Sequence, residues 1–139
     1  MTSGTLHINI KKVTNLPPEV YTIYVRVHSG NSTVRTRILK DCPQEAVFNE
    51  NLQLQVETKD NLYVEVFDIL EESEDKSEEY AQEAHDLLAT SEAVPMLTVV
   101  KDWCTGKYIW LDLNPVAARV AGPVKIHMGM VWDGETAQA

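Results

Sequence analysis

Residues 21–38 read YTIYVRVHSGNSTVRTRI, and this stretch decides the fold. Apolar and polar residues alternate on both sides of Ser29-Gly30-Asn31, which is the period of a half-buried strand. Gly and Asn accept the backbone angles of a tight turn. The stretch therefore predicts a β-hairpin.

The same alternation continues in both directions along the chain. Strands are predicted over 6–10, 48–56, 62–66, 108–113 and 124–132, whereas 87–95 is ambiguous between helix and strand. With the hairpin, this makes eight short strands separated by turn signals. Such a pattern predicts an all-β fold, an eight-stranded antiparallel β-sandwich.

One segment departs from this period. The window 71–86 holds eight acids and one base, and so supplies -7 of the net charge of -9. It also carries apolar residues at helical spacing, which favours a short helix from about Lys76 to His85 within an acidic insertion. The acidity argues against nucleic-acid binding, which requires cationic groups on phosphates.

Length and composition indicate one domain. The chain has 139 residues, 44% of them hydrophobic, so we expect a single domain over 1–132 and a flexible tail over 133–139. No apolar run resembles a signal peptide or a membrane span, so a cytoplasmic location is expected. Because Met1 lies close to the first strand and Trp132 is not followed by a natural ending, we expect the N-terminal domain of a longer protein.

The reactive residue types form no catalytic pattern. Cys42 and Cys104 have no metal-binding spacing, and the four histidines fall on different elements. The sequence has no phosphate loop, dinucleotide fingerprint or HExxH motif. We therefore expect no enzyme and no cofactor. Trp110 is expected in or beside the core.

The order of several short motifs resembles the C2 domain family. These motifs are Gly4–Ile10 followed by Asn15-Leu16, Tyr24–Val27, Phe48-Asn49-Glu50 after Pro43, Leu62–Asp68, Trp110–Leu113 and Gly122–Ile126. A chain that opens on the Gly4-x-Leu6 strand and closes at Trp132 is similar to the phospholipase-like permutation of that family. The resemblance implies a sandwich whose loops bind calcium, lipids or proteins.

The calcium ligands implied by this resemblance are mostly missing. Asp68 matches the first aspartate of the third loop, but the second falls on Leu70 and the first-loop aspartate on Thr22. Calcium takes six to eight oxygen ligands. Asp68 and Glu19 are therefore weak metal candidates, and we expect the domain to work without calcium.

A basic set on the first hairpin has two interpretations. Its members share one predicted face and are Arg26, His28, Arg35 and Arg37. The resemblance implies a phosphoinositide surface there, since arginine forks suit phosphate groups. Alternatively, these residues pair with Glu65 or Glu57 of neighbouring strands.

A protein-binding surface is predicted around Trp103, which we expect to be partly exposed beside the acidic window. Its acidic members are Glu71, Glu72, Glu74 and Asp75. The first hypothesis is thus a calcium-independent C2 domain acting as a protein-protein interaction or scaffold module. The alternative is a calcium-independent module that targets anionic phospholipid membranes through the basic hairpin, placing the protein at the periphery of a membrane or of the cytoskeleton.

Overall fold

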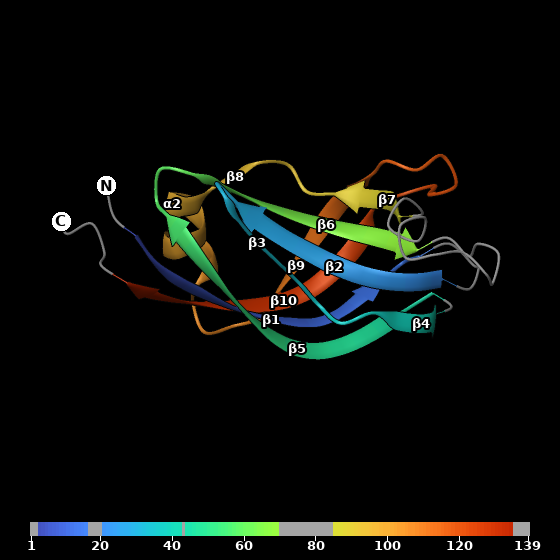
Figure 1. The fold of residues 1–139 in the computed structure, drawn as a ribbon, viewed down its shortest axis with the longest axis horizontal. Helices are drawn as coiled ribbons and strands as arrows, with labels where there is room; N and C mark the ends of the chain where they lie inside the picture. Colours follow the sequence, from blue (N-terminus) through green and yellow to red (C-terminus); the bar gives the residue numbers. More distant parts are fainter. Residues whose placement is uncertain (1–2, 17–20, 43, 70–84, 135–139) are drawn as a thin grey trace, which may run out of the picture.

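The computed structural model describes residues 3–16, 21–42, 44–69 and 85–134. The ten strands of this part are β1 (Ser3–Thr14), β2 (Tyr21–Ser29), β3 (Ser32–Arg35), β4 (Leu39–Cys42), β5 (Ala46–Glu57), β6 (Asn61–Ile69), β7 (His85–Thr90), β8 (Val94–Pro95), β9 (Ile109–Pro115) and β10 (Val124–Gly134). A helical segment, α2 (Met96–Thr98) followed by η2 (Val99–Trp103), precedes β9. Figure 1 shows their arrangement.

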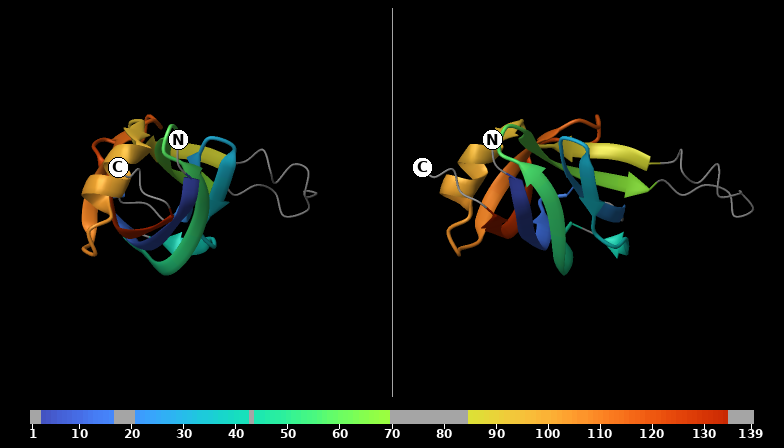
Figure 2. Two further views of the ribbon diagram at one scale, coloured as in Figure 1. Left: turned by 90° about the vertical axis from the view of Figure 1, so that its left-hand side faces the viewer. Right: turned by 60° about the vertical axis from the view of Figure 1, so that its left-hand side comes forward.

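The strands form two antiparallel layers around a common interior (Figure 2). One layer runs β3-β2-β6-β7 and the other β9-β10-β1-β5, and the pairing of β7 with β9 joins them. β1 lies between β5 and the closing strand β10, where Gly4 is opposite Gly134. The predicted antiparallel β-sandwich is confirmed, and its opening and closing strands are neighbours, as expected for the predicted permutation.

The interior follows from the alternation in the sequence. In β5, Phe48, Leu52, Leu54 and Val56 are buried, while Gln53 and Gln55, which alternate with the last three, are exposed. Fully burying one side chain of this size contributes about 1.5–3 kcal/mol. Residues of both layers meet in one apolar cluster, so the two layers stabilise each other.

The strands number ten rather than eight because the third predicted strand is interrupted at Thr36. The Thr36 hydroxyl accepts the backbone N–H of Val25 at 3.0 Å, and the Thr36 backbone N–H donates to the Val25 carbonyl at 2.9 Å. The Thr36 hydroxyl thus replaces a backbone carbonyl as the acceptor of one hydrogen bond from β2, and β3 and β4 pair separately with β2. The tenth strand, β8, is a two-residue pairing with the start of β6.

The helical segment 96–103 was not predicted. Its residues Met96, Val99 and Trp103 follow a helical spacing, and the first two are fully buried. The ambiguous residues 87–95 form β7, a connection and β8. No helix in the described part of the chain has the length and hydropathy needed to cross a membrane.

Two other expectations are corrected. Trp110 is 51% exposed instead of lying in or beside the core, because Ile109, Leu111 and Leu113 take the inward positions of β9. The tail begins later than expected, since Asp133 and Gly134 still pair with β1. The helix predicted for Lys76–His85 lies outside the described residues, except for His85, which begins β7.

Candidate functional site

Asp68 ends the buried part of β6 at the loop end of the sandwich. It is 5% exposed, and its Oδ1 accepts the backbone N–H of Thr22 at 3.1 Å. Its position opposite Asp86 in the β6–β7 ladder brings two carboxylates to neighbouring strands. An acidic pair of this kind needs a cation or a proton to be stable.

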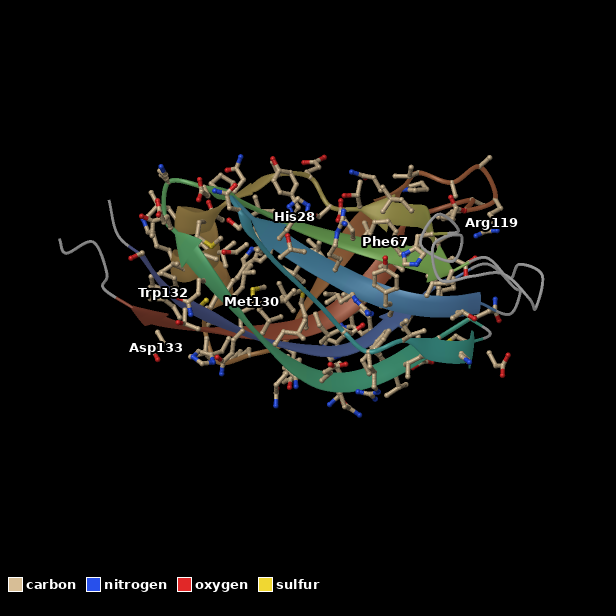
Figure 3. The ribbon with its side chains drawn as sticks, viewed as in Figure 1. His28, Phe67, Arg119, Met130, Trp132 and Asp133 are labelled. Carbon is tan, nitrogen blue, oxygen red and sulfur yellow. The ribbon has the colours of Figure 1, made fainter. Side chains whose placement is uncertain are left out.

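The cation is Arg119, from the connection between β9 and β10. Its Nη2 lies 2.5 Å from Asp68 Oδ2 and 3.0 Å from Asp86 Oδ2. Figure 3 shows Arg119 at the end of the molecule where β6 ends and β7 begins. We call Asp68, Arg119 and Asp86 the arginine clamp. It ties the β9–β10 connection to the other layer.

Burial is the main influence on Asp68. It raises the pKa of the Asp68 carboxyl above its ordinary value, and the charge of Asp86 acts in the same direction. The Thr22 N–H and Arg119 oppose this effect by stabilising the carboxylate. Arg119 thus compensates only part of the free energy that burying the charge costs.

The clamp does not fit a calcium ion. Calcium takes six to eight oxygen ligands, whereas here a guanidinium nitrogen lies within hydrogen-bond distance of both carboxylates. Within the described ranges, no three His, Cys, Asp or Glu side chains are grouped so that they could hold a metal ion. Glu19, the other metal candidate, lies outside the described residues.

Three of the four predicted basic residues come together on the outer face of β2 and β3. Arg26 and Arg35 are directly opposite in the ladder, and His28 follows two residues later. Glu65 of β6 lies among them, with its Oε1 2.7 Å from Arg26 Nε and 3.4 Å from His28 Nε2. The predicted pairing with Glu65 is therefore present, whereas Glu57 pairs with Lys59.

The guanidinium groups of the two arginines lie over aromatic rings of this sheet. The Arg26 guanidinium lies 4.7 Å from the Phe67 ring centre, and that of Arg35 lies 5.1 Å from the Tyr24 ring centre. Tyr24 and Phe67 are themselves stacked at 5.2 Å. Glu65 pairs with Arg26, whereas Arg35 makes no ion pair within the described residues, so the charge of Arg35 is the one on this face that an anionic ligand could pair with.

Arg37 lies apart from this group. It follows β3, and its Nη1 is 3.2 Å from Glu50 Oε1 in the other layer. Its Nη2 also donates to the Phe48 carbonyl at 2.7 Å. The single four-residue patch expected from the alternation is thus incomplete, because the interruption at Thr36 turns Arg37 toward β5.

Trp103 is partly buried against the core at the end of η2. Figure 1 shows the helical segment at the end of the molecule where β10 finishes, opposite the end where β7 begins with His85 and Asp86. Of the acidic window only His85 and Asp86 are described, so the expected placement of Trp103 beside the rest of it concerns residues outside the described part. The acidic candidates Glu71, Glu72, Glu74 and Asp75 lie outside the described residues.

The two thiols are free and poorly suited to nucleophilic chemistry. Burial raises the pKa of Cys104 to about 11 and also raises that of Cys42. The thiolate, which is the reactive form, is therefore scarce near neutral pH. Among the histidines, His85 shares a hydrogen bond of 2.7 Å with the Tyr24 hydroxyl, and His127 stacks on Trp110 at 4.3 Å.

Sequence reasoning missed Arg119 and the ring cluster around Trp110. Arg119 stands in a connection without periodicity, so its sequence context carries no sign of its two carboxylate partners. The exposure of Trp110 could have been found, because it alternates with Ile109 and Leu111.

Solved structures with the same fold include domains of extended synaptotagmins and of phospholipases. The first C2 domain of plant Extended Synaptotagmin 1 matches with a TM-score of 0.65 and 10% identity over 96% of each chain. The calcium-bound pair of C2 domains of Extended-Synaptotagmin 2 matches with a TM-score of 0.68 and 20% identity, over 95% of this chain and 46% of that chain. Human GIVD cytosolic phospholipase A2 matches with a TM-score of 0.58 and 14% identity, over 95% of this chain and 18% of that chain.

This chain therefore spans nearly all of the first structure and less than half of the other two. A search of curated protein sequences found no match. The family model described as C2 domain matches residues 4–90, which is more than half of the chain. The strand order, the sandwich and this match agree, and the chain belongs to the C2 domain family.

Proposed function

We propose that this chain is a non-catalytic, calcium-independent C2 domain that acts as a protein-protein interaction module. C2 domains are non-catalytic units that bind membrane lipids or proteins, in some cases with calcium. The observation that carries calcium independence is the arginine clamp, in which Arg119 occupies the position between Asp68 and Asp86.

The clamp supports calcium independence by a simple electrostatic argument. A calcium ion at Asp68 would face the Arg119 guanidinium at contact distance, where like charges repel each other. Binding would require the guanidinium to leave and the β9–β10 connection to move. The loop end is thus held together by the chain's own cation.

The alternative is a phosphoinositide-binding module that uses the basic face of β2 and β3. Arg26, His28 and Arg35 do gather there, which favours it. Glu65, however, is placed between Arg26 and His28 and would repel a phosphate group. Each basic residue near an anionic bilayer contributes only about 1 kcal/mol. We therefore place protein binding first.

Co-sedimentation with liposomes separates these functions. Vesicles of phosphatidylcholine with phosphatidylserine, and the same vesicles with phosphoinositide, are mixed with the protein in excess calcium and in chelator. The proposal expects no pelleting in any of the four conditions. Pelleting only with calcium would overturn calcium independence. Pelleting in chelator that requires phosphoinositide and is lost in Arg35→Glu, but not in Lys59→Glu, would establish the alternative.

A further inference from the structure

Three aromatic rings lie in a row on the outer face of β9 and β10. Trp110 is 51% exposed and stacks on His127 of β10, with 4.3 Å between ring centres and an angle of 6°. Tyr108, 46% exposed, contacts the same histidine ring, with 5.2 Å between the centres of Tyr108 and His127. Side chains of this size rarely remain this exposed together without a role in binding.

The row is positioned by its neighbours. Gly129 of β10 lies next to the Tyr108 ring, which a Cβ atom at Gly129 would meet at an ordinary contact distance of 3.4 Å. The Tyr108 hydroxyl donates to Asn9 Oδ1 at 2.8 Å, and Asn9 Nδ2 donates to Asn51 Oδ1 at 2.7 Å. These contacts fix the ring cluster before any ligand arrives, which lowers the entropy cost of binding.

An irregularity in β1 adds positive charge to the same face. The register with β10 shifts between Ile10 and Lys12, and Lys11 is the extra residue. As a result, the consecutive residues Lys11 and Lys12 both point outward. The Lys11 ammonium group lies 5.2 Å from the Tyr108 ring centre, and that of Lys12 lies 5.9 Å from the Trp110 ring centre. A regular strand would have turned one of them inward.

A groove of about 390 Å³ borders Tyr108. The amide side chains of Asn9, Asn51 and Gln53 line it, together with Lys107 and the exposed Val131. Lys12 is paired with Glu45 at 3.0 Å, but Lys11 and Lys107 have no carboxylate partner among the described residues. The face therefore offers two ammonium groups, amide hydrogen-bonding groups and exposed rings side by side.

We infer that this face, made of Tyr108, Trp110, His127, Lys11 and Lys107 with the adjoining groove, binds an acidic peptide segment of a partner protein. Carboxylates of the peptide would pair with Lys11 and Lys107, and an aromatic or apolar peptide side chain would pack on the rings. The amides of the groove suit the peptide backbone, which presents both donors and acceptors. The inference rests on the proposed function, since it assigns the surface and partner chemistry of that interaction.

A bilayer fits this face less well than a peptide. Trp110 lies flat on His127, with only 6° between the rings, and does not project as the tip of a loop that could enter the acyl region. The amides of Asn9, Asn51 and Gln53 line the groove beside Tyr108, and they would lose their hydrogen bonds to water in the acyl region of a bilayer.

The test uses a probe of defined chemistry, an immobilised random copolymer of glutamate and tyrosine, with a lysine and tyrosine copolymer of equal length as reference. We expect the wild-type chain to bind the acidic copolymer saturably, with an affinity that falls as the salt concentration rises. It should not bind the lysine and tyrosine copolymer. The double variant Lys11→Glu/Lys107→Glu should bind at least about tenfold more weakly, as should Trp110→Ala.

Matched controls carry the same changes elsewhere. The double variant Lys59→Glu/Lys101→Glu has the same net charge, and Leu97→Ala removes an equally exposed apolar side chain. Both should bind within about twofold of wild type. Absence of saturable binding by wild type, or equal losses in test and control variants, would overturn the inference. Binding to phosphatidylserine vesicles that is lost in Trp110→Ala would overturn it in favour of a membrane. If the wild-type chain does not bind the copolymer, does not pellet with any vesicle and does not respond to calcium, the peptide-binding surface inferred here is refuted, but the proposed function is not.

Discussion

Arg119 connects both layers at the loop end because two carboxylates share its guanidinium. Arg119→Gln removes the charge and leaves Asp68 buried beside Asp86. Breaking a buried pair costs about 3–5 kcal/mol, and because the Arg119 side chain is 32% exposed, we expect a loss of about 1–3 kcal/mol in the free energy of unfolding. Urea unfolding followed by tryptophan fluorescence measures it.

Arg35→Gln is the control for Arg119→Gln. Arg35 lies on the outer face of β3, where its guanidinium rests on the Tyr24 ring and donates to the Thr36 carbonyl. We expect a change below about 0.5 kcal/mol for this variant. Equal stabilities for the two variants would mean that the arginine clamp does not hold the loop end.

Asp68 makes a prediction for pH. Burial raises the pKa of its carboxyl in the folded chain above the ordinary value of 3.8. The folded state then binds more protons than the unfolded state between these two pKa values, so the Asp68 contribution to stability falls as pH rises through that interval. The stabilising contribution of Asp68 is fully present below pH 3.8, where its carboxyl is protonated in both the folded and the unfolded state.

Asp68→Asn isolates this contribution, because the amide does not titrate. Unfolding free energies of wild type and Asp68→Asn are compared from about pH 3 to pH 7. The stability of wild type relative to the variant should decline as pH rises above 3.8. A relative stability that instead climbs with pH would mean that Arg119 and Thr22 outweigh burial.

The paired ends of β1 and β10 approach each other closely at two opposing glycines. A Cβ atom at Gly4 would lie 2.7 Å from the Gly134 Cα and 2.9 Å from the Asp133 carbonyl oxygen and the Trp132 ring. Gly4→Ala should therefore destabilise the chain by about 1–3 kcal/mol, although alanine in a strand otherwise costs less entropy than glycine. Thermal unfolding measures the change.

Gly122→Ala provides the comparison, since a Cβ atom there meets nothing within 4 Å. Its stability should equal or slightly exceed that of wild type. If Gly4→Ala were as stable as Gly122→Ala, the close approach of β1 and β10 would be incorrect.

The elements also show which features a sequence can reveal. Strands with strict alternation, such as β2, β5 and β6, were predicted because one face of each is buried. The interruption at Thr36 and the bulge at Lys11 were not, since each depends on a hydrogen bond or a pairing with a distant strand. The helical segment 96–103 was missed because its few apolar positions are too short a pattern to stand out among strands.

At the scale of the whole molecule, the sandwich brings together residues that are far apart in sequence. Asp68 was predicted from its motif, but its partner Arg119 lies 51 positions away on a different layer. In the same way, Lys11 meets Tyr108 only because β1 and β10 are neighbours. The missing calcium ligands can be recognised in the local sequence. The arginine that takes the place of a calcium ion can be recognised only in the folded structure.

The whole molecule then presents two distinct faces. The outer face of β2 and β3 has Arg26 and His28 paired with Glu65, and the outer face of β9, β10 and β1 has exposed rings with Lys11 and Lys107. Because these faces belong to different layers, substitutions on one should leave binding at the other unchanged. Arg35→Glu is therefore expected to retain wild-type affinity for the acidic copolymer, and a loss there would show that the two faces act as one.

The central claim is that this C2 domain works without calcium. Its most direct test is the thermal unfolding midpoint of the wild-type chain, measured in chelator and across rising calcium concentrations. A ligand that binds only the folded state raises this midpoint with concentration. We predict one midpoint throughout, because Arg119 already supplies the positive charge at Asp68. A midpoint that rises with calcium in wild type, and no longer rises in Asp68→Asn, would contradict the account.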